Sequence, residues 1–229
     1  MNVFDDAPTP ETFIVSDPHF GHNKIFLKEP NRLLGEEKPK KAFKRLCKNW
    51  NAVVGKKDSI LCLGDMFGVS GVRYIDKLKG KKSLILGNHD IKPHNKELLY
   101  SSDFGILHGI CLRIPNGEEI ASEATKQHNN LSGYEQECLS VLVADVGAMR
   151  VMFSHYPLFE RHPSDERFYA LFALLEWLFA QCRCDVVIHG HIHSHNASDS
   201  RCINACVDVT DYAPIRLGAL LERAQKGRR

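Results

Sequence analysis

Polar residues of the kind that bind metal ions recur in five short motifs along this chain. The motifs contain carboxylates, imidazoles and one carboxamide, and most of them follow an apolar run. Because ligands of open α/β sheets gather outside the carboxyl ends of the strands, these distant residues are expected to converge. Oxygen and nitrogen donors without sulfur favour manganese, iron or zinc over copper(I) or an iron–sulfur cluster. The motifs are Ser16-Asp17-Pro18-His19, Gly64-Asp65, Gly87-Asn88-His89-Asp90, Ser154-His155-Tyr156-Pro157 and Gly190-His191-Ile192-His193.

Two of these motifs place candidate ligands two residues apart. Asp17 and His19 leave an extended segment on the same face, so they can hold one ion from one side. His191 and His193 repeat that spacing. Asp65 follows a predicted strand, where a carboxylate can bridge two cations through its two oxygens. Taken singly, the Asp-Pro and Gly-Asp pairs are equally consistent with polar turns.

The third motif carries the most specific chemistry. Gly87 lets the backbone turn sharply after a strand, and Asn88 offers a neutral oxygen to a hard or borderline metal. His89 followed by Asp90 is typical of an imidazole oriented for acid–base chemistry. A polar β-turn is the alternative for this motif. His155, after another apolar run, supplies a further imidazole.

In this order, the blocks D-x-H, G-D, G-N-H-D, H and G-H-x-H resemble the calcineurin-like metallophosphoesterase superfamily. The resemblance runs from about Thr12 to Ile215 and is strongest to small single-domain members with Asp-x-His-Phe-Gly-His near the start, here Asp17 to His22. It implies an α/β fold in which two mixed β-sheets pack as a sandwich flanked by helices, the αββα arrangement.

The resemblance also implies two divalent metal ions bridged by Asp65. Manganese is the first expectation for both ions, and iron, zinc or nickel are alternatives. The first ion would be bound by Asp17, His19 and His193, and the second by Asn88, His155 and His191.

Such a site predicts a metal-dependent phosphoric ester hydrolase, either a phosphodiesterase or a phosphatase. A hydroxide bridging the two ions would attack phosphorus. His89 is the candidate acid for the leaving oxygen, with Asp90 orienting it, and Asn88, His89 and His22 would contact a small phosphate-ester substrate. Two alternatives remain open: a metal-binding scaffold for protein interaction with little or no catalysis, and a nuclease.

Hydrophobic periodicity indicates the elements that must position these residues. Pro39 to Val54 has the spacing of an amphipathic helix with a basic outer face, and strands and helices alternate in the first half. Ile106 to Ile114, Leu139 to Val143 and Ala148 to Phe153 resemble neighbouring, hairpin-like strands. The other predicted elements are strands at 13–15, 59–63, 83–86, 185–189 and 203–209, and helices at 72–78, 164–182 and 217–224.

One polar stretch, Pro115 to Glu137, has no clear periodicity. The sequence therefore predicts a long polar insertion within a single domain that spans residues 1–229. A loop of this length is typically functional or disordered, so a lid or a contact with a partner is the hypothesis for it.

Composition sets the remaining limits. A chain of 229 residues with a formal net charge of +2 can build one sizeable core, and its charge does not indicate nucleic-acid binding, which stays open. The acidic N-terminus lacks the features of a signal peptide, and no apolar run approaches the ~20 residues of a membrane-spanning helix, so a cytoplasmic protein without membrane contact is expected. The eight cysteines are then expected to be reduced and structural. The sequence does not indicate an oligomeric state.

Overall fold

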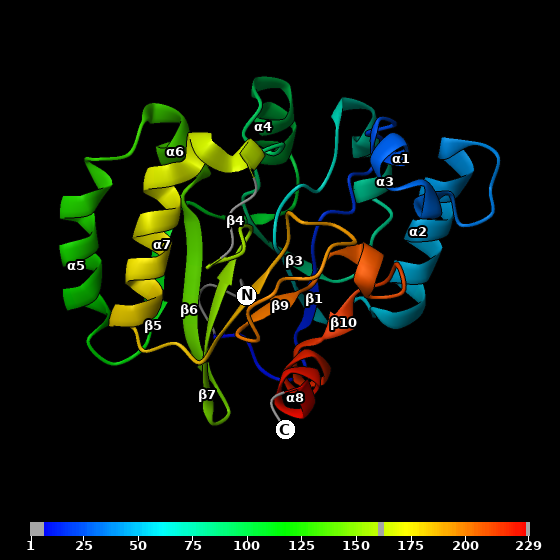
Figure 1. Ribbon diagram of the computed structural model, residues 1–229. Helices are drawn as coiled ribbons and strands as arrows, with labels where there is room; N and C mark the ends of the chain where they lie inside the picture. The colour runs from blue at the N-terminus through cyan, green and yellow to red at the C-terminus, as the bar shows by residue number, and fades with distance from the viewer. Residues whose placement is uncertain (1–6, 160–162, 228–229) are drawn as a thin grey trace.

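Two five-stranded β-sheets form the centre of the computed structural model, which describes residues 7–159 and 163–227 (Figure 1). The first sheet has the strand order β10-β1-β2-β3-β4. Strands β1 to β4 run parallel to one another, and the edge strand β10 is antiparallel to β1. The bounds are β1 Phe13–Val15, β2 Ser59–Cys62, β3 Lys81–Ile85, β4 Gly105–Leu107 and β10 Ile215–Arg216.

The second sheet has the order β5-β6-β7-β8-β9. Only β6 and β7 are antiparallel neighbours, and they form a hairpin. The pairs β5–β6, β7–β8 and β8–β9 are parallel. The bounds are β5 Gly109–Arg113, β6 Ser140–Val146, β7 Met149–Ser154, β8 Val186–His189 and β9 Cys202–Asn204. The two mixed sheets with flanking helices confirm the predicted α/β fold class.

Strand residues alternate between two apolar layers because successive side chains point to opposite faces. In β1, Ile14 joins the cluster that fills the space between the sheets, whereas Phe13 and Val15 pack in the cluster that includes the helices. Leu61 and Leu142 belong to the same inter-sheet cluster as Ile14. Both faces of the central strands are therefore buried, which explains why the strands are continuous apolar runs.

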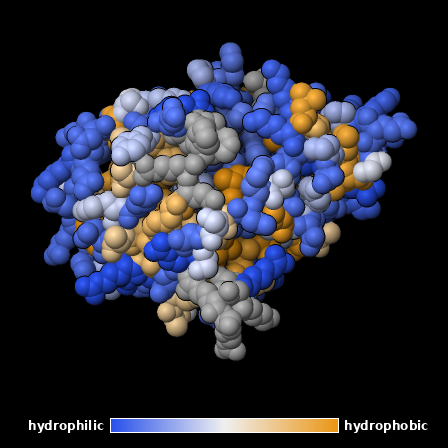
Figure 2. All heavy atoms as spheres, in the orientation of Figure 1, coloured by the Kyte–Doolittle hydropathy of each residue, from blue (hydrophilic) through white to orange (hydrophobic). Residues whose placement is uncertain are grey.

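Helices cover the outer faces of the sandwich. The α2 helix buries Phe43, Leu46, Cys47 and Trp50 and leaves its lysines exposed. The hydrophilic left edge of the molecule in Figure 2 lies over α5. The helix bounds are α1 Ile25–Lys28, α2 Pro39–Val53, α3 Val72–Ile75, α4 Pro93–Tyr100, α5 Gly117–His128, α6 Gly133–Cys138, α7 Tyr169–Gln181 and α8 Leu217–Gly227, with short 3-10 helices at Pro30–Leu33, Val69–Gly71, Pro163–Phe168 and Val207–Val209.

The prediction of an irregular polar loop at 115–137 is wrong. This segment forms α5 and α6, which connect β5 to β6. Because β5 and β6 are parallel, the chain needs a crossover between them, and helices are the usual form. A capping box between Ser132 and Glu135 begins α6, and the Glu135 carboxylate also accepts the backbone N–H groups of Ala170 and Leu171 at the start of α7.

Two strand predictions also need correction. The stretch 106–114 is split between β4 and β5, which belong to different sheets, so it is not one strand and it does not pair with β6 as a hairpin. The stretch 203–209 ends its strand at Asn204 and continues as a 3-10 helix from Val207 to Val209. The eight cysteines are free thiols.

Candidate metal centre

All seven predicted metal ligands lie at one end of the sandwich, where their strands end. Each one follows the carboxyl end of β1, β2, β3, β7 or β8 within a few residues, because the parallel strands of both sheets end there. The residues that the structure brings together are Asp17, His19, Asp65, Asn88, His155, His191 and His193.

The first group of donors surrounds His19. Its Nε2 lies 3.6 Å from Asp17 Oδ1 and 3.5 Å from Asp65 Oδ2. Two donors that share one ion at metal–ligand distances near 2.1 Å are about 3.0–3.4 Å apart, so these separations are close to those of a bound site. Asp17 Oδ1 and His19 Nε2 are also buried and have no hydrogen-bond partner among the described residues. Buried polar atoms without a partner are rare, and a cation between these two would satisfy both.

The second group surrounds His155. Its Nε2 lies 3.2 Å from Asn88 Oδ1, 3.3 Å from His191 Nδ1 and 3.8 Å from Asp65 Oδ2. The other ring nitrogen, Nδ1, is 2.8 Å from the carbonyl oxygen of Leu63, which can only accept a hydrogen bond. Nδ1 therefore carries the hydrogen and Nε2 presents its lone pair to the group.

Asp65 stands between the two groups. Its Oδ2 approaches both His19 Nε2 and His155 Nε2, whereas its Oδ1 accepts the backbone N–H of His89 at 2.8 Å. One carboxylate oxygen is thus held by the protein, and the other faces donors from both groups. Asp65 would therefore bridge two ions through Oδ2 alone, and not through both oxygens as the sequence suggests.

Backbone conformation at these positions is unusual. Five of the seven candidate ligands have positive φ angles between 47° and 72°, a backbone conformation that residues other than glycine rarely adopt. Such residues persist where surrounding structure fixes them, and they cluster at functional sites. The five are Asp17, His19, Asp65, His191 and His193.

Two motif glycines are required by close approach of neighbouring groups. A Cβ atom on Gly87 would overlap Asp65 Oδ1, and a Cβ atom on Gly190 would overlap Ser16 Oγ and Asp17 Oδ2. Without a side chain at Gly190, Asp17 Oδ2 accepts hydrogen bonds from the His191 backbone N–H (2.8 Å) and the Cys206 thiol (3.2 Å). These bonds engage Oδ2 and leave Oδ1 for a ligand.

The electrostatics of the carboxylates differ. Burial opposes ionisation of Asp17, but neighbouring imidazoles, first that of His155, hold its pKa well below the usual value. Burial, and then the negative charge of Asp17, raise the pKa of Asp65 to about 7. Burial lowers the pKa of His19 well below the usual value, so its ring is neutral, as a metal ligand must be.

Asp90 does not have the role that the sequence suggests. Its carboxylate accepts the backbone N–H groups of Asp65 (2.6 Å), Met66 (3.0 Å) and Gly87 (2.9 Å), and it makes no hydrogen bond with the ring of His89. It therefore ties the loop after β2 to the loop after β3. The physical reason is that three backbone N–H groups of these two turns point toward the Asp90 carboxylate and are satisfied by it.

Lys92 contacts His89 instead. The Lys92 Nζ atom lies 2.9 Å from His89 Nδ1. Because an ammonium group only donates, Nδ1 is the acceptor and the ring proton sits on Nε2. His89 Nε2 is 4.0 Å from Asp65 Oδ2, at the edge of the ligand group. Burial, and then the charge of Lys92, lower the pKa of His89 to about 3.

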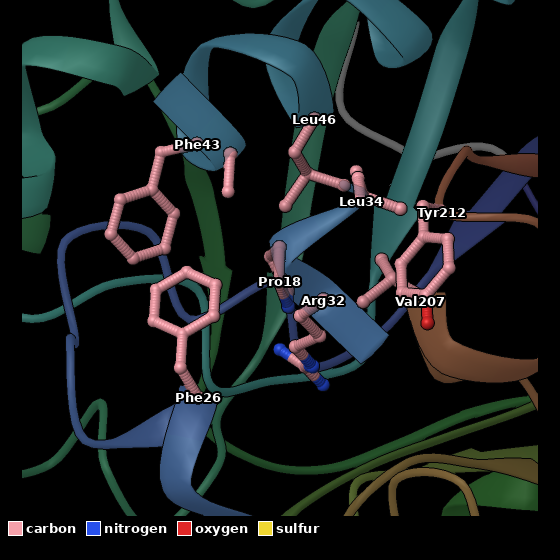
Figure 3. A pocket seen from close by; sticks show the side chains of 9 residues that line it. Pro18, Phe26, Arg32, Leu34, Phe43, Leu46, Val207 and Tyr212 are labelled. Carbon is pink, nitrogen blue, oxygen red and sulfur yellow. The ribbon is translucent and has the colours of Figure 1, made fainter. Parts of the chain in front are cut away.

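Behind His193 lies a pair that the motifs do not reveal, Arg32 and Asp208. Arg32 Nε donates to Asp208 Oδ1 at 2.7 Å, and Nη2 contacts Asp208 Oδ2. The same guanidinium donates to the carbonyl of Asp17 at 2.8 Å and lies 3.0 Å from His193 Nδ1. Figure 3 shows Arg32 among apolar side chains, which enclose a cavity of about 10 Å³, room for about one water molecule. Arg32 is thus an anchor for the ligands and not part of a substrate pocket.

The remaining histidines of the motif region also have defined places. The His22 ring lies 5.0 Å from that of His89 and 5.4 Å from that of His19, so this predicted substrate-binding residue belongs to the same cluster. His189 is fully buried in β8, with Nδ1 2.9 Å from the carbonyl of Gly190, and its position matches a packing role.

Comparison with known proteins identifies the class that this fold and cluster define. The chain belongs to the calcineurin-like phosphoesterase family, whose profile matches residues 12–195. Membership indicates metal-dependent hydrolysis of phosphoesters, which makes the protein a hydrolase with a phosphate-ester substrate.

Among individual proteins, the Gene 66 protein of Mycobacterium phage L5 is 31% identical over 192 residues, 80% of this chain and 77% of the phage protein. The Gene 66 protein of Mycobacterium phage D29 is 27% identical over 190 residues and covers similar shares, 80% and 78%. A solved structure of a protein of unknown function from Aquifex aeolicus has a TM-score of 0.59 at 23% identity, over 89% of this chain and 94% of that one, and shares the fold. No helix in the described part of the chain is long and apolar enough to cross a membrane.

Proposed function

We propose that this protein is a phosphoric ester hydrolase that holds two divalent ions side by side, with manganese as the first candidate and iron, zinc or nickel as alternatives. The ligands are those expected from the resemblance. In that assignment Asp17, His19 and His193 take the first ion, Asn88, His155 and His191 take the second, and Asp65 bridges them. Close approach of Asp17 to His193 and of Asp17, Asp65 and His155 to one another supports it.

One observation carries the proposal. Asp65 Oδ2 lies 3.5 Å from His19 Nε2 and 3.8 Å from His155 Nε2, at the junction of two donor groups that each combine residues from both sheets. The buried, unpartnered Asp17 Oδ1 and His19 Nε2 support it further, since nothing within the described residues satisfies them.

When bound, two such ions would supply Lewis acidity toward the phosphoryl oxygens and an activated water at neutral pH. The residues of the chain do the positioning. His89 carries its proton on Nε2, which faces the ligand cluster, and donates it as a hydrogen bond to the leaving or phosphoryl oxygen. His22, half-buried beside His89, is in reach of the same phosphate.

The same metal ligands serve phosphodiesters and phosphomonoesters, so the test uses one substrate of each kind. The purified protein is loaded with Mn²⁺, its metal content is measured, and bis-p-nitrophenyl phosphate is compared with p-nitrophenyl phosphate. We expect two ions per chain and hydrolysis that Asp65→Asn abolishes together with metal binding. A protein that holds two ions and hydrolyses neither ester would contradict the proposal and favour the interaction scaffold.

A nuclease is the remaining alternative. The basic face of α2, which includes Lys41, Lys44 and Lys48, lines an open hollow on the outside of the molecule. Binding of a nucleic acid through several phosphates would weaken steeply with salt. Salt-independent, weak binding of single-stranded DNA would exclude that alternative.

A further inference from the structure

Cations border the candidate metal centre. Lys92 Nζ lies 2.9 Å from His89 Nδ1, beside the ligand cluster. Lys24 is the N-cap residue of α1 and Lys28 its last residue, and Arg167 directly precedes Phe168, the N-cap residue of α7. Figure 1 places α1, α4 and the start of α7 at one end of the molecule, so these cations form a positive rim at that end. Among the carboxylates whose side chains the structure describes, none forms an ion pair with any of these four cations.

An aromatic stack continues outward from the second ligand group. The ring of His191 lies 6.4 Å from that of Phe168, and Phe168 stacks on Tyr134 at 5.7 Å with an interplanar angle of 26°. The guanidinium carbon of Arg167 is 4.8 Å from the Phe168 ring centre and 5.5 Å from that of Tyr134. Phe168 is buried, whereas Tyr134 is 39% exposed. The outer end of the stack thus offers an aromatic surface and a cation to solvent.

Tyr134 comes from α6, the helix within the segment that the sequence describes as an insertion. Its place is fixed from two sides. The capping box of Ser132 and Glu135 sets the start of α6, and Glu135 also binds the first backbone N–H groups of α7, next to Arg167 and Phe168. Figure 1 places α6, the start of α7, α4 and α1 at the same end of the molecule. The aromatic surface is therefore rigidly held at the end where the ligands lie.

From these contacts we infer that Tyr134 and Arg167 form a subsite for a planar base, so that the substrate is a nucleotide-type phosphate ester. This inference rests on the proposed function and names its substrate class. The phosphate occupies the region of His89 and His22, the cationic rim takes up its negative charge, and the base lies on Tyr134 beside the Arg167 guanidinium. An alkyl phosphate would leave the exposed ring without a partner.

The expected energetics follow from stacking. A base on an aromatic side chain contributes enough to binding that removing the ring costs about 10-fold or more in affinity. The cations contribute to the binding of any phosphate ligand, because charge attraction does not depend on the base. The two contributions can therefore be separated with ligands that share the phosphate and differ only in the base.

The test compares AMP with ribose 5-phosphate, titrated by calorimetry into the Mn²⁺-loaded protein. We expect the parent protein to bind AMP about 10-fold or more tightly than ribose 5-phosphate. Tyr134→Ala should reduce that ratio to about one, and Tyr134→Phe, which keeps the ring, should restore it. Arg167→Ala should weaken AMP binding more than ribose 5-phosphate binding.

Other exposed side chains of the same kinds provide matched controls. Tyr100, the last residue of α4, is exposed and stacks on His108, and Arg201 stacks on Phe159 while paired with Asp199. Tyr100→Ala and Arg201→Ala should therefore leave the ratio as in the parent protein. Equal affinity of the parent for both ligands, or an unchanged ratio in Tyr134→Ala, would overturn the inference. Because binding is measured without turnover, this outcome is distinct from absence of ester hydrolysis, which would contradict the proposed function.

Discussion

Arg32 and Asp208, separated by 176 residues in the chain, form a buried pair directly behind the candidate ligand His193. The Asp208 carboxylate oxygen Oδ2 is 3.7 Å from His193 Nδ1. Arg32 Nη2 lies 3.0 Å from the same nitrogen, and because a guanidinium only donates, His193 Nδ1 is the acceptor of this hydrogen bond. Asp208 accepts from the other side of the guanidinium and so holds Arg32 against His193.

This relationship predicts the effect of breaking the pair. Asp208→Asn and Arg32→Met should each weaken binding of one Mn²⁺ ion about 10–100-fold, measured by calorimetry. Asp199→Asn, which breaks the exposed pair with Arg201, is the matched control and should leave both affinities unchanged. Parent-like metal binding in Asp208→Asn would show that His193 does not depend on this carboxylate.

A second prediction concerns the approach of two ligand loops. In Gly190→Ala the new methyl group overlaps Ser16 Oγ and Asp17 Oδ2, so Asp17 must move away from its position. We expect loss of metal binding together with a lower Tm. Gly133→Ala is the control, because no atom lies within 4 Å of its Cβ position. If Gly190→Ala binds two ions as the parent does, the observed approach of these loops is not required for the site.

Asp90 gives a prediction that separates its observed contacts from the role suggested by its neighbour His89. Asp90→Asn weakens the bonds to three backbone N–H groups, and a buried donor left unsatisfied costs about 1–3 kcal/mol. Urea unfolding should show a loss of that size in the metal-free protein. Unchanged stability with a selective loss of turnover of alkyl esters would instead favour an orienting role toward His89.

The pH dependence of metal binding should follow Asp65. Burial and the charge of Asp17 raise the pKa of Asp65 to about 7. The protonated form of Asp65 is therefore favoured in the folded, metal-free protein, and the stability that it contributes is lost as pH rises through about 7. An ion needs the carboxylate, so it competes with a proton below that pH and not above it. The increase in Tm on adding Mn²⁺ should therefore be larger at about pH 8 than at about pH 5.5. An equal increase at both pH values would contradict this assignment.

The sequence predicts an α/β fold because strands and helices alternate, and it predicts that the candidate ligands converge because each follows an apolar strand within a few residues. The αββα sandwich itself was expected only from the resemblance. The sequence could not predict Arg32 as part of the site, since only the folded chain brings it to Asp208. The helical form of 117–138 was missed for a different reason. The α5 helix buries small or isolated apolar residues such as Ala124, so its periodicity is weak, although the Ser132-x-x-Glu135 pattern is a typical helix start.

The last prediction concerns His89 and its proton on Nε2. Because the low pKa of His89 leaves its ring neutral, this proton acts as a hydrogen bond to the leaving oxygen and not as a transferred proton. His89→Ala should then retain two ions and lower kcat for an alkyl phosphate ester about 10²–10³-fold. The loss should be smaller for a p-nitrophenyl ester, because p-nitrophenolate needs little help from a proton donor. His94→Ala, which removes an exposed histidine of α4, is the matched control and should not alter either rate. A His89→Ala protein with bound metals and parent-like hydrolysis of the alkyl ester would assign the donor role elsewhere.

Lys92→Met tests how the proton of His89 is placed. Without the Lys92 donor on Nδ1, the ring is free to adopt the other tautomer, and the leaving-group dependence should shift toward that of His89→Ala.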